Sequence, residues 1–224
     1  MSPAFLIVLL WLAFGVSHIV LSSVRLRPRL VAVLGEQGFM GGFSLVSLLT
    51  FVPLVTVYFG HKHEGALLWA SGVGPVGFWL ISIGMGIALI LLVGGVLTPS
   101  PASMGAGGAE TPVEARGIHL ITRHAVFMGM GLFGLLHLFA NGFATDVAFF
   151  AGFPIFVVVG AMHQDRRKLA PEGSPYRAFY EATPLLPFTG SRTLQGLREI
   201  GWKAPLAGIV LTGVIRYYHS AWFG

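Results

Sequence analysis

Histidine is the residue type in this chain with the greatest capacity for chemistry. The sequence has eight histidines and no cysteine, which excludes disulfides, thiolate ligands and cysteine nucleophiles. His18 and His137 lie inside long apolar runs, and His124 stands where one such run begins. An ionisable side chain within an apolar run is costly and marks a functional position by default. Because neutral imidazole ligates haem iron, zinc and copper, we expect the histidines to hold any cofactor.

Simpler roles stay open for each histidine. A single imidazole among packed helices can form a hydrogen bond with a neighbouring helix. His61 and His63, followed by Glu64, form a pattern that either binds zinc or stays solvated on a loop. His119 and His124 are five residues apart, about 500° of rotation on a helix, so they do not share one helical face.

The composition indicates that the histidines are positioned by membrane helices. Of the 224 residues, 54% are hydrophobic and only 10% are charged, and the mean hydropathy is +0.78. A soluble domain carries about 25% charged residues, so a lipid bilayer is the expected surrounding. The net charge of +5 does not indicate a nucleic-acid partner, because the basic residues cluster on loops that flank apolar runs.

Apolar runs of about 20 residues, long enough to cross a bilayer, predict about six transmembrane helices in an all-α, polytopic bundle. The runs lie at 3–23, 39–59, 76–98, 123–142, 145–163 and 203–221. The short link between the fourth and fifth runs predicts an antiparallel hairpin. We expect one domain, 1–224, with a mobile linker at 99–116 and an interfacial segment of short helices at 164–202.

The basic residues predict the orientation. Of the 14 lysines and arginines, all except Lys62 and Arg216 fall on one side of the predicted spans. The positive-inside rule assigns the rich side to the cytoplasm, so both termini are expected outside, in the periplasm of a bacterial inner membrane. No acidic residue lies deeper in a predicted span than Asp146, at an outer edge, which argues against a carboxylate-based ion pump.

Two short motifs carry a resemblance to a known family. The sequence Ile-Thr-Arg-His at 121–124 begins the fourth run, and Asp-Arg-Arg at 165–167 follows the fifth. Together with Ser17 and His18 in the first run, they make the chain resemble the NnrU family of bacterial membrane proteins, which is associated with denitrification. The same positions resemble the plant 15-cis-zeta-carotene isomerase, a relative of that family. The resemblance covers nearly the whole chain.

The resemblance implies that haem b is bound through His18 and His137. Their predicted depths in the bilayer differ by about 13 Å, at 1.5 Å per residue, so His124 is the alternative second ligand. The isomerase has a cysteine at the position of Gly134, so a thiolate ligand switch is impossible here.

Three arginines near these histidines are candidates for anion contacts. Arg123, Arg166 and Arg167 could bind haem propionates or a nucleotide-type cofactor, or they could simply anchor the cytoplasmic side.

Three functional hypotheses follow. The first is a haem-dependent redox or sensing role linked to nitrogen-oxide metabolism, which requires a redox partner. The second is isomerisation of a lipophilic polyene, as in the isomerase that the chain resembles. The third is a cytoplasmic cofactor site, similar to that of membrane methyltransferases and sterol reductases, or a cofactor-free assembly factor.

Overall fold

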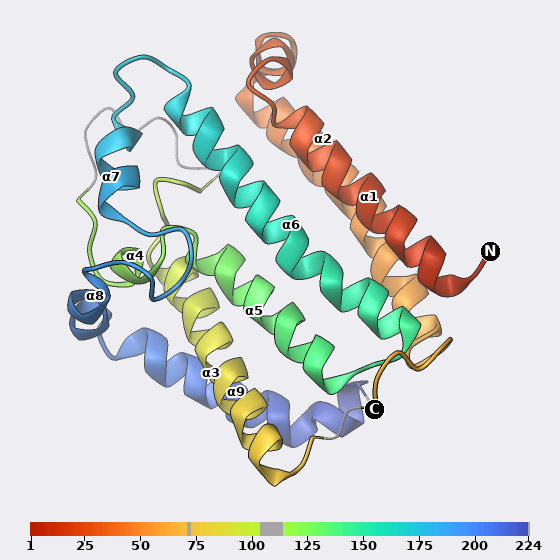
Figure 1. Ribbon diagram of the computed structural model, residues 1–224. Coiled ribbons are helices and arrows are strands. Elements are labelled where there is room, and N and C mark those ends of the chain that lie inside the picture. Colours follow the sequence, from red (N-terminus) through yellow and green to blue (C-terminus); the bar gives the residue numbers. More distant parts are fainter. Residues whose placement is uncertain (71–72, 104–113, 224) are drawn as a thin grey trace.

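The protein is an assembly of helices. The structure, a computed structural model, describes residues 1–70, 73–103 and 114–223, and all regular elements within them are helices (Figure 1). The predicted all-α class is therefore confirmed. The helices are α1 Pro3–Leu21, α2 Leu26–Gly60, α3 Pro75–Leu97, α4 Ile118–Ile121, α5 Ala125–Ala140, α6 Ala144–Leu169, α7 Tyr176–Ala182, α8 Thr193–Glu199 and α9 Lys203–Phe223.

Each of the six predicted apolar runs forms a helix, and four of these helices are long and apolar enough to cross a membrane. Those four are α1, α2, α3 and α6. Helix α5 has 16 residues and spans about 24 Å, less than a hydrocarbon core of about 30 Å. Helix α9 is long enough but more polar. The protein is thus an integral membrane protein, with six as an approximate count of membrane helices.

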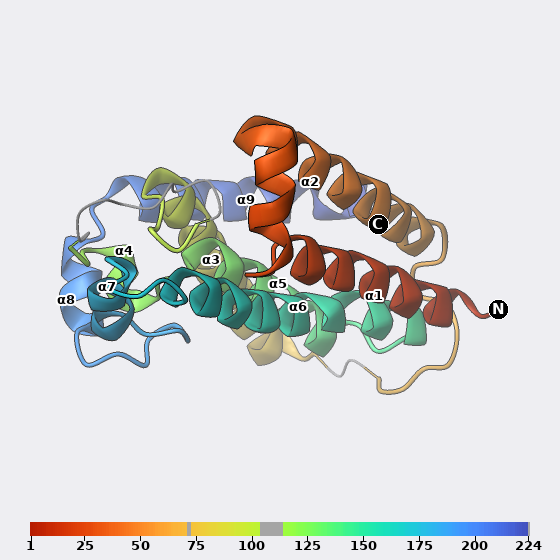
Figure 2. The same ribbon diagram turned by 90° about the horizontal axis from the view of Figure 1, so that it is seen from above.

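The long helices pack in a curved row with α6 at its centre. Helix α6 packs between α1 and α5, α2 packs against α1, and α3 packs between α5 and α9. Figure 2 shows α1 and α6 side by side, with α2 and α9 above them in the picture. The predicted hairpin is confirmed, since α5 ends at Ala140 and α6 begins at Ala144.

Glycines let α5 approach both of its neighbours closely. A Cβ atom on Gly134 would lie 2.6 Å from the Phe153 Cβ and 2.7 Å from the Phe150 carbonyl oxygen. On another face of α5, a Cβ on Gly129 would lie 2.6 Å from the Ala88 carbonyl oxygen of α3. Small residues at these positions bring the backbones into direct contact, as is common between membrane helices.

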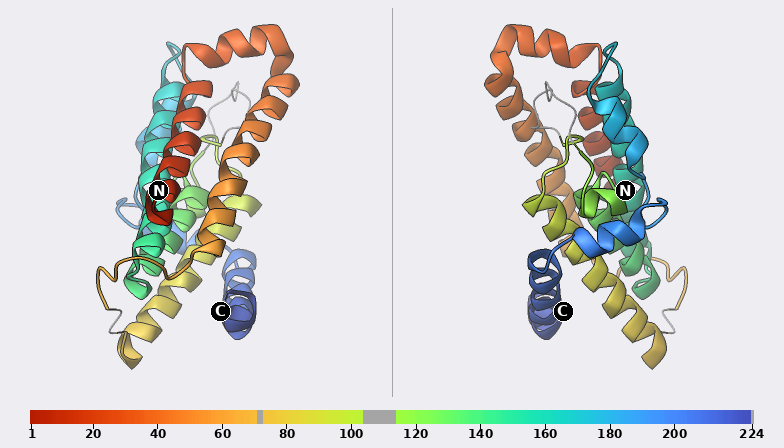
Figure 3. Two further views of the ribbon diagram at one scale, coloured as in Figure 1. Left: turned by 90° about the vertical axis from the view of Figure 1, so that its right-hand side faces the viewer. Right: turned by 90° about the vertical axis from the view of Figure 1, so that its left-hand side faces the viewer.

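Helix α2 has two parts that the sequence analysis did not separate. The predicted run began at residue 39, but the helix starts at Leu26 and breaks at Gly35, whose φ of 71° favours glycine. Residues 26–34 therefore lie crosswise over the end of the bundle, while the rest of α2 runs along α1 (Figure 3). This break brings Arg27 to that end.

We call this end of the bundle, which carries residues 26–34, α4, α7 and α8, the basic end. Residues 164–169 of the predicted interfacial segment continue α6, and the remainder contains the short helices α7 and α8. A small apolar core joins α7 to α4 through Leu120, Tyr176 and Phe179, and α8 packs against α4. Most of the predicted linker 99–116 lies outside the described residues.

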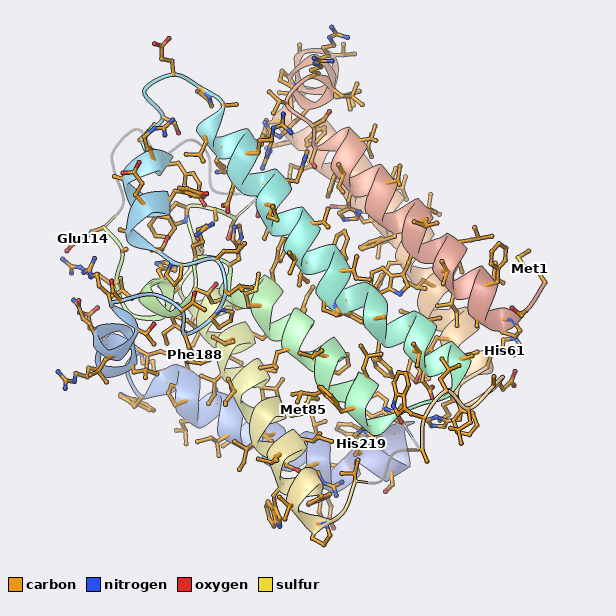
Figure 4. The ribbon with its side chains drawn as sticks, viewed as in Figure 1. Met1, His61, Met85, Glu114, Phe188 and His219 are labelled. Atoms are coloured by element: carbon orange, nitrogen blue, oxygen red, sulfur yellow. The ribbon has the colours of Figure 1, made fainter. Side chains whose placement is uncertain are left out.

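Both termini lie at the opposite end of the bundle (Figure 1). The Lys62 ammonium donates to the Phe223 carbonyl oxygen at 2.8 Å, which ties the end of α2 to the C-terminal helix. Figure 4 shows the same separation, with Glu114 at the basic end and His61 near Met1 at the other. The two termini therefore lie at the same end of the bundle.

A histidine-lined cavity as the candidate site

A cavity of about 360 Å³ opens inside the basic half of the bundle. Its walls come from α1, α2, the end of α3, α4, α5 and α6, and they are mostly apolar. Four histidines line it, namely His18, His119, His124 and His163. A mostly apolar cavity of a few hundred cubic ångströms with a few polar groups is typical of sites for small molecules and cofactors.

His18 reaches the cavity from α1 with one ring nitrogen already engaged. Its Nδ1 lies 3.0 Å from the Phe14 carbonyl oxygen and its Nε2 lies 3.2 Å from the Ser47 hydroxyl. Because a carbonyl only accepts, Nδ1 carries the proton and Nε2 has the lone pair. The rings of Phe43 and Phe156 pack around the imidazole. His18 therefore presents Nε2 as an acceptor or ligand in apolar surroundings.

His124 belongs to a buried network centred on Asp165. One Asp165 oxygen lies 2.8 Å from His124 Nε2 and accepts a hydrogen bond from the Tyr176 hydroxyl at 2.6 Å. The other oxygen lies 2.8 Å from Arg123 Nη2. Burial, followed by the hydrogen bond to Asp165, raises the pKa of Tyr176, so its hydroxyl stays protonated. The carboxylate thereby fixes the ring orientation of His124.

Arg123 anchors the loop between α4 and α5 within the protein. Its Nη1 donates to the Thr183 carbonyl oxygen at 2.7 Å, and its guanidinium lies 4.3 Å from the centre of the Tyr180 ring. Beside it, the Thr122 hydroxyl donates to the Leu185 carbonyl oxygen at 2.6 Å. The Ile-Thr-Arg-His motif thus attaches α5 to the segment after α7. Arg123 reaches the cavity wall, but its guanidinium is paired with the Asp165 carboxylate.

The other two predicted arginines differ in position. Arg167 lines the cavity, whereas Arg166 is exposed and borders a separate hollow on the outside of α6. Arg123 and Arg167 both line the cavity, but Arg123 is paired with Asp165. The Arg167 side chain has no hydrogen bond or ion pair with any of the described residues.

His137 lies outside the cavity. Its Nδ1 donates to the Phe133 carbonyl oxygen at 2.9 Å, and its ring stacks on Phe150 of α6 with centroids 4.5 Å apart. Three contacts with α6 place these histidines along the bundle: the His137 ring lies against Phe150, the His18 ring lies against Phe156, and His124 Nε2 lies against Asp165. His137 is not among the residues that line the cavity, whereas His18 and His124 are.

The structure therefore brings His18 and His124 to one cavity and leaves His137 outside it. His119, His163 and Asp165 were not among the predicted site residues. A signal for His163 was present, because Phe156, Gly160, His163 and Arg167 recur at helical spacing and all four line the cavity. The signal was obscured because the predicted span ended at residue 163, although α6 continues to Leu169.

The two histidines of the predicted zinc pattern, His61 and His63, contact two different carboxylates. His61 Nδ1 lies 2.9 Å from Glu64, and His63 Nδ1 lies 2.8 Å from Asp146. The Asp146 carboxylate is fully buried and also accepts from the Tyr58 hydroxyl at 3.1 Å. Within the part of the chain that the structure describes, no group of three or more His, Asp or Glu side chains could hold a metal ion by itself.

His119 makes the stability of the basic end dependent on pH. Its Nε2 donates to the Thr98 carbonyl oxygen at 3.1 Å, and burial lowers its pKa below the ordinary value of 6.5. The unfolded chain then binds more protons than the folded protein below pH 6.5, so stability falls as pH falls through that value. We expect the unfolding temperature in detergent to fall by several degrees from pH 7.5 to 5.5. The His119→Gln variant should show a smaller decrease, and an equal decrease would contradict this role.

Fold and cavity together define a polytopic helical membrane protein with a histidine-lined, largely apolar site toward one end of the bundle. Comparison with known families is more specific. The sequence matches the model of the family described as NnrU protein over residues 6–224, so the chain belongs to the NnrU family.

Two curated relatives share an enzyme name. The chain is 26% identical over 195 residues to the chloroplastic 15-cis-zeta-carotene isomerase of Zea mays and 25% identical over 195 residues to that of Arabidopsis thaliana. Each match covers 84% of this chain and 50% of the relative, so the chain spans about half the length of the curated relatives it matches. No solved structure matches the chain.

Proposed function

We propose that the protein binds haem b in the cavity, where His18 and His124 would hold the iron, and that it has a redox or sensing role. The observation that carries the proposal is the presence of His18 and His124 on the wall of one apolar cavity. They come from α1 and α5, two helices that are separated by α6. The residues fit the group, because the donors are imidazoles and most of the cavity wall is apolar.

The protein's own contacts prepare both imidazoles for this task. His18 is held through Nδ1 by the Phe14 carbonyl, so Nε2, which lies 3.2 Å from the Ser47 hydroxyl, is the atom that would hold the iron. His124 is held through Nε2 by Asp165, which leaves Nδ1. A hydrogen bond from the second ring nitrogen to a carbonyl or carboxylate is the usual support for a metal-bound histidine, since it fixes the tautomer and raises the basicity of the ligand.

When bound, haem supplies one-electron chemistry, and its potential depends on the ligands and on exclusion of water. The phenylalanines of the cavity wall keep water away from the site, and Asp165 places a negative charge beside His124. We propose that the basic end faces the cytoplasm of a bacterium, in accordance with the positive-inside rule. The link to nitrogen-oxide metabolism follows from the association of the NnrU family with denitrification.

The absorbance spectrum of the purified protein tests this proposal. Protein from haem-replete cells, extracted in mild detergent, is expected to carry about one haem per chain, by analogy with other haem proteins that use proximal histidine. After reduction with dithionite, sharp visible bands of a low-spin, six-coordinate haem should appear. A colourless protein, or one that does not take up added haemin, would overturn the proposal.

A second candidate function is isomerisation of a lipophilic polyene, which the similarity to the two plant enzymes favours. The isomerase's cysteine corresponds to Gly134, where even a Cβ atom would lie 2.6 Å from Phe153. Any isomerase mechanism here would therefore proceed without a thiolate at this position. Conversion of a cis-carotene by cells that express only this protein would establish the activity, and unchanged carotene in cells with confirmed expression would exclude it.

A further inference from the structure

Three side-chain nitrogens at the basic end are buried without a hydrogen-bond partner in the part of the chain that the structure describes. They are Nε of Arg27, Nε2 of His163 and Nε of Arg167. Buried polar groups in folded proteins are nearly always hydrogen-bonded, so each such group calls for an explanation. The occurrence of three in one region indicates that a polar ligand is recognised there.

Two of the three side chains line the cavity, and the third, Arg27, lies near one of them. His163 and Arg167 are one turn apart on α6, and both line the cavity. Arg27 comes from the crosswise part of α2, where its guanidinium lies 5.2 Å from the centre of the Phe39 ring. Arg27 is close enough to Arg167 to act on its charge. The break at Gly35 is what brings these two guanidiniums together.

Positive charge is in excess in this region. Glu36 forms an ion pair with Arg27 and also acts on the charge of Arg167, but none of the described residues forms an ion pair with Arg167 itself. Lys168 lies near both arginines. Two guanidiniums in a medium of low dielectric repel each other strongly unless an anion lies between them. Guanidinium groups bind carboxylates and phosphates by charge-assisted hydrogen bonds.

We propose that Arg27, His163 and Arg167 form an anion site for the carboxylate or phosphate group of an amphiphile, whose apolar part lies in the cavity. The wall below His163 consists of Phe156, Phe14 and their neighbours, so an anion at the arginines adjoins apolar surface. Both a porphyrin with carboxylate side chains and an acidic membrane lipid have this chemistry. The anion site does not depend on haem binding, because either source would occupy it.

Binding titrations with paired probes test the site. The purified protein in detergent is titrated with haemin or haemin dimethyl ester, and separately with phosphatidic acid or phosphatidylcholine that carry brominated chains. Quenching of tryptophan fluorescence reports binding, since Trp11 contacts Phe14 and Phe156 of the cavity wall. The variants are Arg27→Gln and Arg167→Gln, with the exposed Arg29→Gln and Arg166→Gln as matched controls.

The expected result is that Arg167→Gln and Arg27→Gln each weaken binding of an acidic probe about tenfold, the effect of one lost charge-assisted contact, while neutral probes and control variants are unchanged. If the variants weaken binding of haemin, the anion that the site binds is the porphyrin carboxylate. If they weaken binding of phosphatidic acid, it is a lipid phosphate. A response with phosphatidic acid alone would support the anion site while the haem proposal fails. Equal binding of every acidic probe to Arg167→Gln and Arg166→Gln would overturn the anion site.

The stability of the ligand-free variants is a second readout. Arg167→Gln removes a buried charge that no ion pair engages, so the unfolding temperature is expected to stay the same or to rise. A marked decrease would mean that Arg167 has an essential structural role in the ligand-free protein, and it would contradict a role in ligand binding.

Discussion

The Asp165→Asn variant is expected to lose about 3–5 kcal/mol of unfolding free energy, which is the usual cost of breaking a buried ion pair by removing one partner. The Asp165 side chain is almost fully buried and interacts with Arg123, His124 and Tyr176. Without the carboxylate, the Arg123 charge stays buried and unpaired. Chemical denaturation in detergent, followed by tryptophan fluorescence, measures the loss.

Glu172→Gln provides the matched control for this prediction. Glu172 is exposed and close to the end of α6, so its replacement should change stability by no more than about 0.5 kcal/mol. A loss below about 1 kcal/mol for Asp165→Asn would mean that the network contributes little to stability. In that case the attachment of α5 to the segment after α7 would have to rest on the Thr122 contact and the small apolar core.

The His18→Ala variant is expected to lose haem almost completely, to less than about a tenth of the wild-type content, because haem is held by its axial ligands. The substitution leaves the rings of Phe14, Phe43 and Phe156 in place. Haem content is measured as the pyridine haemochrome per mole of protein. Added imidazole should restore binding, since it can occupy the space vacated by the side chain.

A purely structural role for His18 predicts a different pattern. The variant would then unfold at a lower temperature, and imidazole would restore neither haem nor stability. Full haem content in His18→Ala, with normal stability, would remove His18 from the site.

The sequence was informative about the membrane helices because their signal is local. Each of the six apolar runs forms a helix, and the boundaries agree within a few residues except at the start of α2 and the end of α6. Both exceptions have one cause. Residues 26–34 and 164–169 combine charged and apolar side chains, so hydropathy excludes them from a span although their backbones continue the helix.

The site was harder to predict because it depends on contacts between distant segments. The resemblance implied His18 and His137, and that pair stays a prediction. Depths estimated from the sequence favoured His124, and in the structure His18 and His124 line one cavity whereas His137 does not. The roles of the three arginines could not be separated from sequence, because pairing with a carboxylate depends on side-chain geometry.

Figure 3 illustrates why the anion site in particular was not predictable. Arg27 belongs to the crosswise part of α2, and only the positive φ of Gly35 turns that part over the end of the bundle. A glycine within an apolar segment can have several structural roles, and nothing in the sequence shows that Gly35 breaks the helix.

The most direct test of the account is the spin state of ferric haem in His124→Gln and His137→Gln, measured by electron paramagnetic resonance. Glutamine at 124 can still donate to Asp165, so the buried network is preserved while the imidazole ligand is lost. We predict that His124→Gln converts the low-spin signal of the wild-type protein to a high-spin one and that His137→Gln keeps the low-spin signal. The reverse result, with low-spin haem lost in His137→Gln and retained in His124→Gln, would contradict haem ligation inside this cavity.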